Sequence, residues 1–223
     1  MPRNREKVRK RLQWAALELY RERGYEDTTA AEIAAKAGVT ERTFFRHFPD
    51  KREVLFDGDT AFIAALTTAV RNAPAALGPW DTLLVAFNSV KQTLVENRPF
   101  TEPRQRVIAS SPALQERALA KTRSLIAAVA SALCERGLPV PKANLAAQMG
   151  MATLSHGVAA WFSDGSIDLG EHIVRAFQEA RDISSSNLAV AKGKRKTQRL
   201  PGKGKAALMQ RGKGWIKSDT PSL

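Results

Sequence analysis

Five side chains between residues 42 and 47 have the functional groups needed to contact a DNA duplex. They are Arg42, Thr43, Phe45, Arg46 and His47. An arginine can donate two hydrogen bonds to a guanine edge, hydroxyl and imidazole groups can bind phosphate oxygens, and an aromatic ring can contact a thymine methyl group. The alternative is an ordinary solvated helix face, because short motifs of this kind also arise by chance. The neighbouring elements therefore decide between the two interpretations.

Two short helices are predicted to position these groups. The Thr29 hydroxyl can accept a hydrogen bond from the unpaired amides at a helix start, and Gly38 favours the left-handed conformation that often ends a helix. Thr40 can cap a second helix, which Pro49 terminates. Two helices this short, joined by so few residues, are typical of a helix-turn-helix motif.

A third, amphipathic helix is predicted from Arg11 to Tyr25, with Gly24 at its end. Its apolar face consists of Leu12, Ala15, Ala16, Leu19 and Tyr20. Phe44 and Phe48 stand four residues apart and are expected to anchor the later helix in the core of the module. The three helices together predict a compact DNA-binding module.

Residues 15–56, AALELYRERGYEDTTAAEIAAKAGVTERTFFRHFPDKREVLF, resemble the DNA-binding domain of the tetracycline-repressor (TetR) family of bacterial transcription regulators. The resemblance covers about residues 10–56 without gaps. It implies that Thr29 and Lys51, at the starts of the second and fourth helices, contact phosphate. It also implies that the recognition-helix positions contact bases or backbone. Those positions are Thr40, Glu41, Arg42, Thr43, Phe45, Arg46 and His47.

Three of these positions differ from the residues often found in the family. Glu41, Arg42 and Arg46 stand where small or aromatic residues are common, so the DNA sequence preferred by other members cannot be transferred. Each arginine could bind a guanine edge, whereas Glu41 could accept from cytosine or repel phosphate.

Positive charge is concentrated at the two ends of the chain. Residues 1–11 contain six Lys or Arg and one Glu, and residues 185–223 contain ten Lys or Arg and one Asp, within a total net charge of +13. We predict an unstructured N-terminal arm that contacts the DNA backbone or minor groove, the alternative being a frayed terminus. We predict a disordered tail after about residue 184 that adds salt-dependent DNA affinity, the alternative being a solvated extension without a role.

The remaining chain is predicted to be helical, which makes the fold all-α. No stretch alternates between polar and apolar residues as strands do, and apolar residues recur at helical spacing. The predicted helices are 50–72 (one long helix capped by Asp50), 80–95, 100–109, 114–133, 143–162 and 168–182. The predicted organisation is a DNA-binding domain in residues 1–50, a ligand-binding and dimerisation domain in 51–184, and the tail in 185–223.

The last two helices carry more apolar residues than one packing face requires. These are Leu145, Met149, Leu154, Val158, Trp161, Phe162, Ile173, Val174 and Phe177. The resemblance implies that these helices pair with those of a second chain, and the alternative is packing within one chain. A homodimer is favoured by function, because two recognition helices read more base pairs than one.

The resemblance also implies a pocket for a small-molecule effector between about Asp50 and Gly137, closed from the dimer side. Candidate lining residues are Phe62, Phe87, Phe100, Arg104, Gln105, His156 and Trp161. A weaker similarity in the C-terminal half points to lipophilic molecules or acyl thioesters.

Several other classes of protein are disfavoured. The single Cys134 excludes an intrachain disulfide, no apolar run approaches the roughly 20 residues of a membrane span, and a cytoplasmic location is expected. Catalytic motifs and metal-ligand spacing are not found, so neither enzymatic activity nor a cofactor is expected. The predicted function is a ligand-responsive repressor that binds a palindromic operator on double-stranded DNA as a dimer. The alternative is a sequence-tolerant architectural DNA-binding protein driven by its basic ends.

Overall fold

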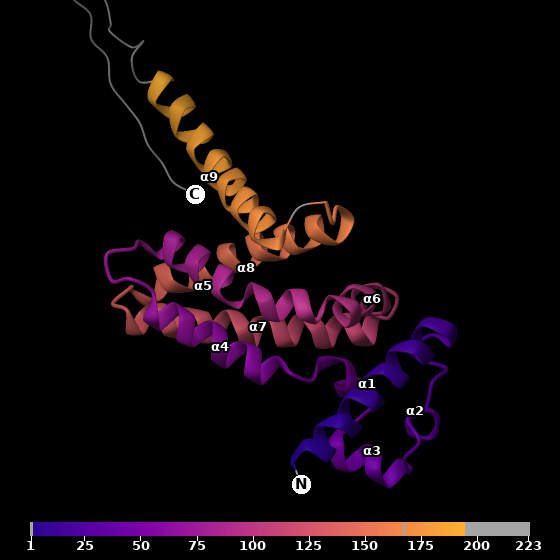
Figure 1. The fold of residues 1–223 in the computed structure, drawn as a ribbon. Coiled ribbons are helices and arrows are strands. Elements are labelled where there is room, and N and C mark those ends of the chain that lie inside the picture. The colour runs from indigo at the N-terminus through magenta and orange to yellow at the C-terminus, as the bar shows by residue number, and fades with distance from the viewer. Residues whose placement is uncertain (1, 167, 195–223) are drawn as a thin grey trace, which may run out of the picture. The chain divides into compact units, whose positions relative to one another are not determined.

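The computed structural model describes residues 2–166 and 168–194, and the fold over these residues is entirely helical. They form nine α-helices and one short 3-10 helix, with no strand (Figure 1). The chain divides into two compact units, Met1–Ile183 and Ser184–Leu223, and the first contains both hydrophobic cores. The predicted all-α class is confirmed.

The N-terminal module consists of α1 (Pro2–Arg23), α2 (Ala30–Lys36) and α3 (Glu41–His47). The predicted end of α1 is confirmed, because Gly24 adopts a φ of 89° directly after the helix. The helices enclose a core of almost fully buried side chains. Its members include Leu12, Leu17, Ile33, Phe44 and Phe48.

The prediction of an unstructured N-terminal arm was wrong, because α1 begins at Pro2. Val8 lies four residues before Leu12 and extends the apolar stripe of the helix by one turn. Lys10 and Glu6 form an ion pair one turn apart, and Arg9 binds the carboxylate of Asp57. These contacts hold the basic segment in a helix and fix its position beside α3.

The predicted long helix from Asp50 to residue 72 was also wrong. The Asp50 carboxylate caps a 3-10 helix instead, η1 (Glu53–Phe56), by accepting hydrogen bonds from the amides of Arg52 and Glu53. Gly58 then adopts a left-handed φ of 95°, and α4 (Asp59–Asn72) begins after it. A glycine can take this conformation without steric penalty, so the chain changes direction here.

The body of the protein contains α4 and five further helices. These are α5 (Pro79–Glu96), α6 (Arg98–Ala109), α7 (Pro112–Glu135), α8 (Val140–Ser163) and α9 (Leu169–Lys194). Helix α4 packs against α5 and α7, and α8 packs against both α5 and α7. Helix α9 extends ten residues beyond the predicted boundary at 184, and the rest of the predicted tail lies outside the described residues.

The second core lies inside the body. Its largest buried side chains include Leu66, Leu83, Phe87, Leu133 and Phe177. The Phe177 ring on α9 contacts Trp80 and Phe87 on α5, with ring centroids 4.6 and 5.8 Å apart. Cys134 packs partly buried against this core. No helix in the described ranges is both long and apolar enough to cross a membrane.

The N-terminal core does not end at residue 50. The three apolar residues of η1 are buried in it, and so are Val107 of α6 and Leu114 of α7. Trp14 of α1 also contacts Phe100 of α6, with ring centroids 5.4 Å apart. The helices of the body therefore complete the core of the N-terminal module.

Candidate nucleic-acid interface

Helix α2 begins with a complete capping box. The amide of Glu32 donates to the Thr29 hydroxyl over 3.2 Å, and the amide of Thr29 donates to the Glu32 carboxylate over 2.8 Å. The Thr29 amide and hydroxyl both donate to the Glu32 carboxylate, and this lowers the pKa of Glu32 below its usual range. The predicted cap is confirmed, and both Thr29 polar groups are held at an exposed helix start.

The turn between α2 and α3 is held by Arg11. Gly38 adopts a φ of 65°, as its predicted role as a helix stop requires. The Arg11 guanidinium donates to the carbonyl oxygens of Ala37 and Gly38. A Cβ atom at Gly38 would meet the Arg11 Nη2 atom at 2.9 Å, a contact that the flexible arginine could relieve by moving, so the left-handed backbone is what favours glycine here. Arg11, predicted to belong to a DNA-contacting arm, is therefore a structural residue of the turn.

Helix α3 begins at Thr40, whose hydroxyl accepts a hydrogen bond from the amide of Thr43 over 3.2 Å, as predicted. Phe44 and Phe48 are almost fully buried and anchor the helix. The opposite face is exposed to solvent. It carries Thr40, Glu41, Arg42, Phe45 and Arg46, with Thr43 partly covered. Half of the Phe45 surface is exposed, so its ring is available to contact a thymine methyl group.

His47 is not on the exposed face where we expected it. Only 8% of its surface is accessible, because it precedes the anchor Phe48 and faces the first turns of α1. Burial lowers the pKa of His47, and the guanidinium groups of Arg46, Arg5 and Arg9 lower it further. The spacing from Phe44 to His47, three residues along a helix, was the sequence signal that His47 would lie on the inward side.

Lys51 lies in a turn before η1 and not at the start of a helix. Its ammonium group donates to the carbonyl oxygens of Tyr25, Glu26 and Thr28 over 2.8, 3.2 and 2.9 Å. It also lies 4.2 Å from the centre of the Tyr25 ring. An ammonium group has three hydrogens, so a phosphate contact through Lys51 would have to replace one of these bonds.

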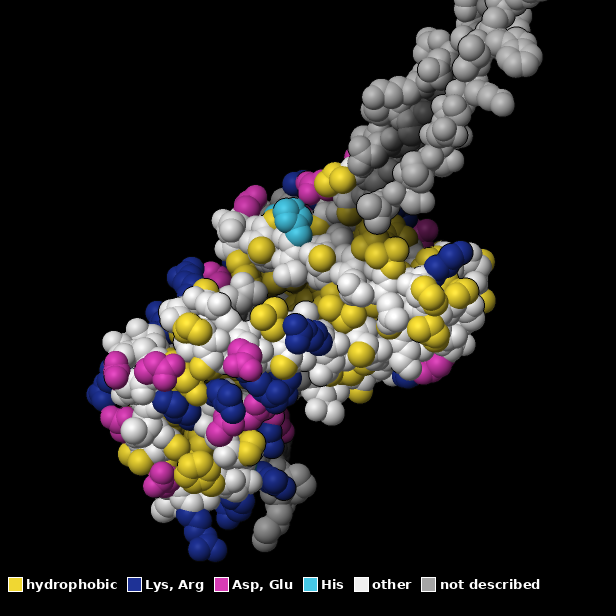
Figure 2. All heavy atoms as spheres, turned by 180° about the vertical axis from the view of Figure 1, so that it is seen from behind, with side chains coloured by type: hydrophobic (Ala, Val, Ile, Leu, Met, Phe, Trp, Pro, Cys, Tyr) yellow, Lys and Arg dark blue, Asp and Glu magenta, His cyan; other side chains and the backbone are white. Residues whose placement is uncertain are grey.

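Charged side chains gather over the N-terminal helices on the face shown in Figure 2, whereas the body carries mainly apolar and uncharged groups there. Several charged side chains of the module form ion pairs within it. Lys36 binds Glu18 and Glu22 over 3.0 and 3.5 Å, and Arg23 binds Glu32 over 3.1 Å. The exposed arginines of α3 lie on the same module and give its outer surface a basic character.

The structure does not bring the seven predicted effector-binding residues together. Phe62, Phe87 and Trp161 belong to the core of the body, where the Arg98 guanidinium lies 4.4 Å from the centre of the Trp161 ring. Gln105 is exposed on α6. His156 on α8 is exposed and lies 3.3 Å from the carboxylate of Glu179.

The other two predicted effector-binding residues lie where the module meets the body. Phe100 packs against Trp14, and Arg104 donates to the carbonyl oxygen of Leu55. These contacts join the N-terminal module to the body of the protein.

Two capped helices at a tight turn, with an arginine-bearing face exposed on the second, define a helix-turn-helix DNA-binding module. Comparison with known families agrees with this class. Residues 14–57 match the family described as bacterial regulatory proteins, tetR family, and residues 77–183 match the MftR C-terminal domain. The chain belongs to the TetR family of bacterial regulators.

Individual relatives support the same assignment. The chain is 39% identical to TcmR, a helix-turn-helix transcriptional regulator of Streptomyces glaucescens, over 84 residues, which is 38% of this chain and 37% of TcmR. It is 25% identical over 173 residues to MftR of Mycobacterium tuberculosis, a regulator named for mycofactocin biosynthesis, covering 73% of this chain and 83% of MftR.

A solved structure shows the same fold at low identity. FadR of Bacillus subtilis, in complex with stearoyl-CoA, superimposes with a TM-score of 0.55 at 20% identity, covering 76% of this chain and 96% of FadR. At this level of identity the similarity shows the fold alone.

Proposed function

We propose that this protein is a ligand-responsive transcription regulator that represses genes by binding a palindromic DNA site as a homodimer. The observation that carries the proposal is the exposed face of α3, which presents Arg42, Phe45 and Arg46 opposite the buried aromatic anchor. These are the groups that contact base edges and phosphates in the major groove. A regulator that binds such a site would act in the cytoplasm of a bacterium.

The dimer is proposed to form through α8 and α9. Val140, Leu145 and Met149 on α8 and Val174 on α9 are large apolar residues with 40 to 62% of their surface exposed. Exposed apolar residues on adjacent helices are typical of a protein interface. Four other apolar residues that the sequence suggested for the interface are instead buried within the chain. They are Leu154, Trp161, Ile173 and Phe177.

The geometry of a dimer would increase specificity. One α3 helix contacts only a few base pairs, whereas two related by symmetry contact half-sites about 34–36 Å apart. A palindromic site would then be preferred over other DNA by a factor of about 10³ or more.

The effector is proposed to be a small lipophilic molecule bound in the helical body. The complex of FadR with stearoyl-CoA supports this class of molecule, because it places a long acyl chain in a protein of the same fold. An effector can release DNA only if it binds the released conformation more tightly than the DNA-bound one. A change from mostly bound to mostly free requires a difference of several kcal/mol.

Selection of genomic DNA fragments by the full-length protein at moderate salt tests this proposal. We expect one palindromic sequence to be enriched, and the double variant Arg42→Ala/Arg46→Ala to lose the enrichment. Arg21→Ala is the control, since it removes an exposed arginine that lies near the C-terminal end of α1 and not on α3. If the protein binds all fragments alike, it is a sequence-tolerant DNA-coating protein and the proposed function is wrong.

A further inference from the structure

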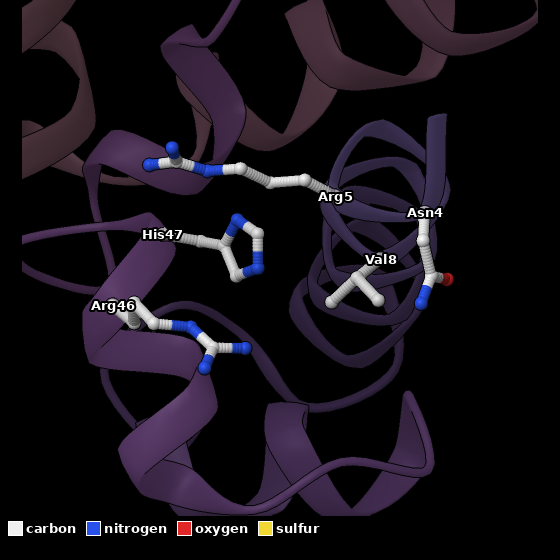
Figure 3. Close-up of a pocket in the computed structure, with 5 residues that line it drawn as sticks. All are labelled: Asn4, Arg5, Val8, Arg46 and His47. Atoms are coloured by element: carbon white, nitrogen blue, oxygen red, sulfur yellow. The ribbon is translucent and has the colours of Figure 1, made fainter. Parts of the chain in front are cut away.

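A pocket lies between the first turns of α1 and the last turn of α3. It has a volume of about 320 Å³ and is lined by Asn4, Arg5, Val8, Arg46 and His47 (Figure 3). Its volume is at the lower limit for pockets that hold small organic molecules, and such pockets are usually lined by apolar groups. The guanidinium groups of Arg5 and Arg46 belong to its lining, and such groups bind small anions.

His47 is the most unusual group in this pocket. More than nine-tenths of its surface is buried, and its Nδ1 atom has neither a hydrogen-bond partner nor contact with solvent. In Figure 3 the imidazole ring lies between the guanidinium groups of Arg5 and Arg46 and faces Val8. A buried polar atom without a partner is destabilising, so its presence in a folded protein calls for a physical explanation.

The charges that face His47 have a positive sum. Arg5 and Arg9 come from α1, Arg46 comes from α3, and Asp57 comes from the segment after η1. Arg9 already binds Asp57, with its Nε atom 2.8 Å from the carboxylate. Asp57 is thus the only carboxylate among these four groups, and it is paired with Arg9. The positive charges of Arg5 and Arg46 near the imidazole are therefore not balanced within this group.

The start of α1 adds to this positive field. A helix of 22 residues carries partial positive charge at its N-terminus, and Asn4 and Arg5 lie in the first turn. Arg46 links the pocket to the exposed face of α3, so the pocket adjoins the proposed DNA-binding surface. A phosphate group combines the negative charge and the hydrogen-bond acceptors that these side chains would bind.

We propose that this pocket binds one phosphate of the DNA backbone and that His47 takes up a proton from solvent when the phosphate enters. The inference rests on the proposed DNA-binding function. A phosphate beside the imidazole favours its charged form, so phosphate binding and protonation strengthen each other. The resulting imidazolium adds a positive charge beside the guanidinium groups of Arg5 and Arg46, and this charge attracts the bound anion.

The direction of the pH effect follows from this linkage. In the free protein, burial and the surrounding guanidinium groups lower the pKa of His47, so the ring is neutral near pH 7. Bound phosphate raises that pKa. DNA affinity is therefore highest at low pH and decreases as the pH rises through the pKa of the bound state. Each pocket contributes at most about a tenfold change in Kd per pH unit, because it takes up at most one proton.

The first test measures the Kd of the full chain for its selected duplex between about pH 6 and pH 8. We expect wild-type affinity to fall as the pH rises, and the His47→Gln variant to show a flat profile. Glutamine places an amide donor near the position of Nε2 but does not titrate. His156 and His172 remain in the variant, so any residual pH dependence belongs to them. Equal pH dependence in the two proteins would overturn the proposal.

The second test follows the His47 imidazole by NMR in the wild-type protein, which avoids any effect of substitution on folding. We expect the duplex to raise the pKa of His47, and inorganic phosphate at the same phosphate concentration to raise it less. An unchanged pKa with bound duplex would overturn the proposal. An equal rise with inorganic phosphate would overturn the assignment to DNA and identify a site for free phosphate.

The contribution of Arg5 is tested by Arg5→Ala, with Arg21→Ala as the control about 24 Å away along the same helix. We expect Arg5→Ala to reduce the salt dependence of DNA binding by about one counterion per pocket and to raise the pKa of His47 in the free protein. Arg21→Ala should change neither quantity, and equal effects of the two variants would overturn the proposal. If no duplex is selected at all, the proposed function fails, whereas selection with pH-independent binding contradicts this inference alone.

Discussion

The guanidinium of Arg104 on α6 donates a hydrogen bond to the carbonyl oxygen of Leu55 in η1 over 2.9 Å. The same guanidinium lies 5.5 Å from the centre of the Phe56 ring. Glu53, at the start of η1, binds Arg117 and Lys121 of α7. The segment that joins α3 to α4 is therefore held by side chains of two body helices. A displacement of either helix by an effector would act directly on η1, and through it on the core beneath α3.

Replacing Arg104 by Met tests the contribution of this contact. Methionine keeps an apolar stem but removes the charged donor. We expect the free energy of unfolding to fall by about 1.5–3 kcal/mol, because a hydrogen bond from a charged group is lost. Denaturant unfolding measures the change. The control is Arg106→Met on the same helix, where the side chain is 81% exposed and its removal should have little effect. Equal stability of the two variants would show that the Arg104 contact is not stabilising.

Replacing Thr29 by Ala should destabilise the protein by about 1 kcal/mol, because the capping box of α2 is lost. Thr29→Ser keeps the hydroxyl and serves as the control. The difference between wild type and Thr29→Ala should also depend on pH. The pKa of Glu32 is lowered in the folded state, so its contribution is present above its ordinary pKa and disappears as the pH falls through the lowered one. The Thr29 amide remains in the variant and still donates to Glu32, so a pH-independent difference would show that the bond from the Thr29 hydroxyl to the carboxylate does not contribute.

Replacing Lys51 by Met separates a structural role from a phosphate contact. Its ammonium binds three carbonyl oxygens, so we expect lower stability and an unchanged salt dependence of DNA binding. Unfolding experiments and DNA titrations at several salt concentrations measure the two effects. Unchanged stability with a salt slope reduced by about one would instead identify Lys51 as a phosphate ligand.

Replacing Arg42 by Ala should weaken binding at particular base pairs by about 1–3 kcal/mol, if its guanidinium makes a bidentate contact with guanine. Arg46 lines the pocket beside His47, so Arg46→Ala should weaken binding to all sequences by similar factors. Affinities for a set of single-substituted duplexes distinguish the two patterns. Uniform losses for Arg42→Ala would reassign Arg42 to the DNA backbone.

Truncating the chain after Lys194 should leave the preferred DNA sequence unchanged and make binding less dependent on salt. The removed segment contains eight Lys or Arg and one Asp. Its positive charge would release counterions from any DNA sequence, so it adds affinity without specificity. The truncated protein keeps all of α9. An unaltered salt slope would show that the tail does not bind DNA.

Local sequence signals determined much of the DNA-binding module. Thr29 predicted the start of α2, Gly38 its end and Thr40 the start of α3. Caps and helix stops can be predicted in this way because they depend on residues only a few positions apart. The four-residue spacing of Phe44 and Phe48 predicted which side of α3 is anchored. The resemblance in residues 15–56 then indicated the family, which the comparisons confirmed.

Only the tertiary structure decided the surroundings of that module. The burial of His47 depends on α1 starting at Pro2, some forty residues earlier in the chain. The N-terminal core is completed by Val107 and Leu114, which no local pattern connects to α3. Caps and apolar spacing are encoded within one or two helical turns, whereas burial and shifted pKa values arise from side chains that meet only when distant segments fold together.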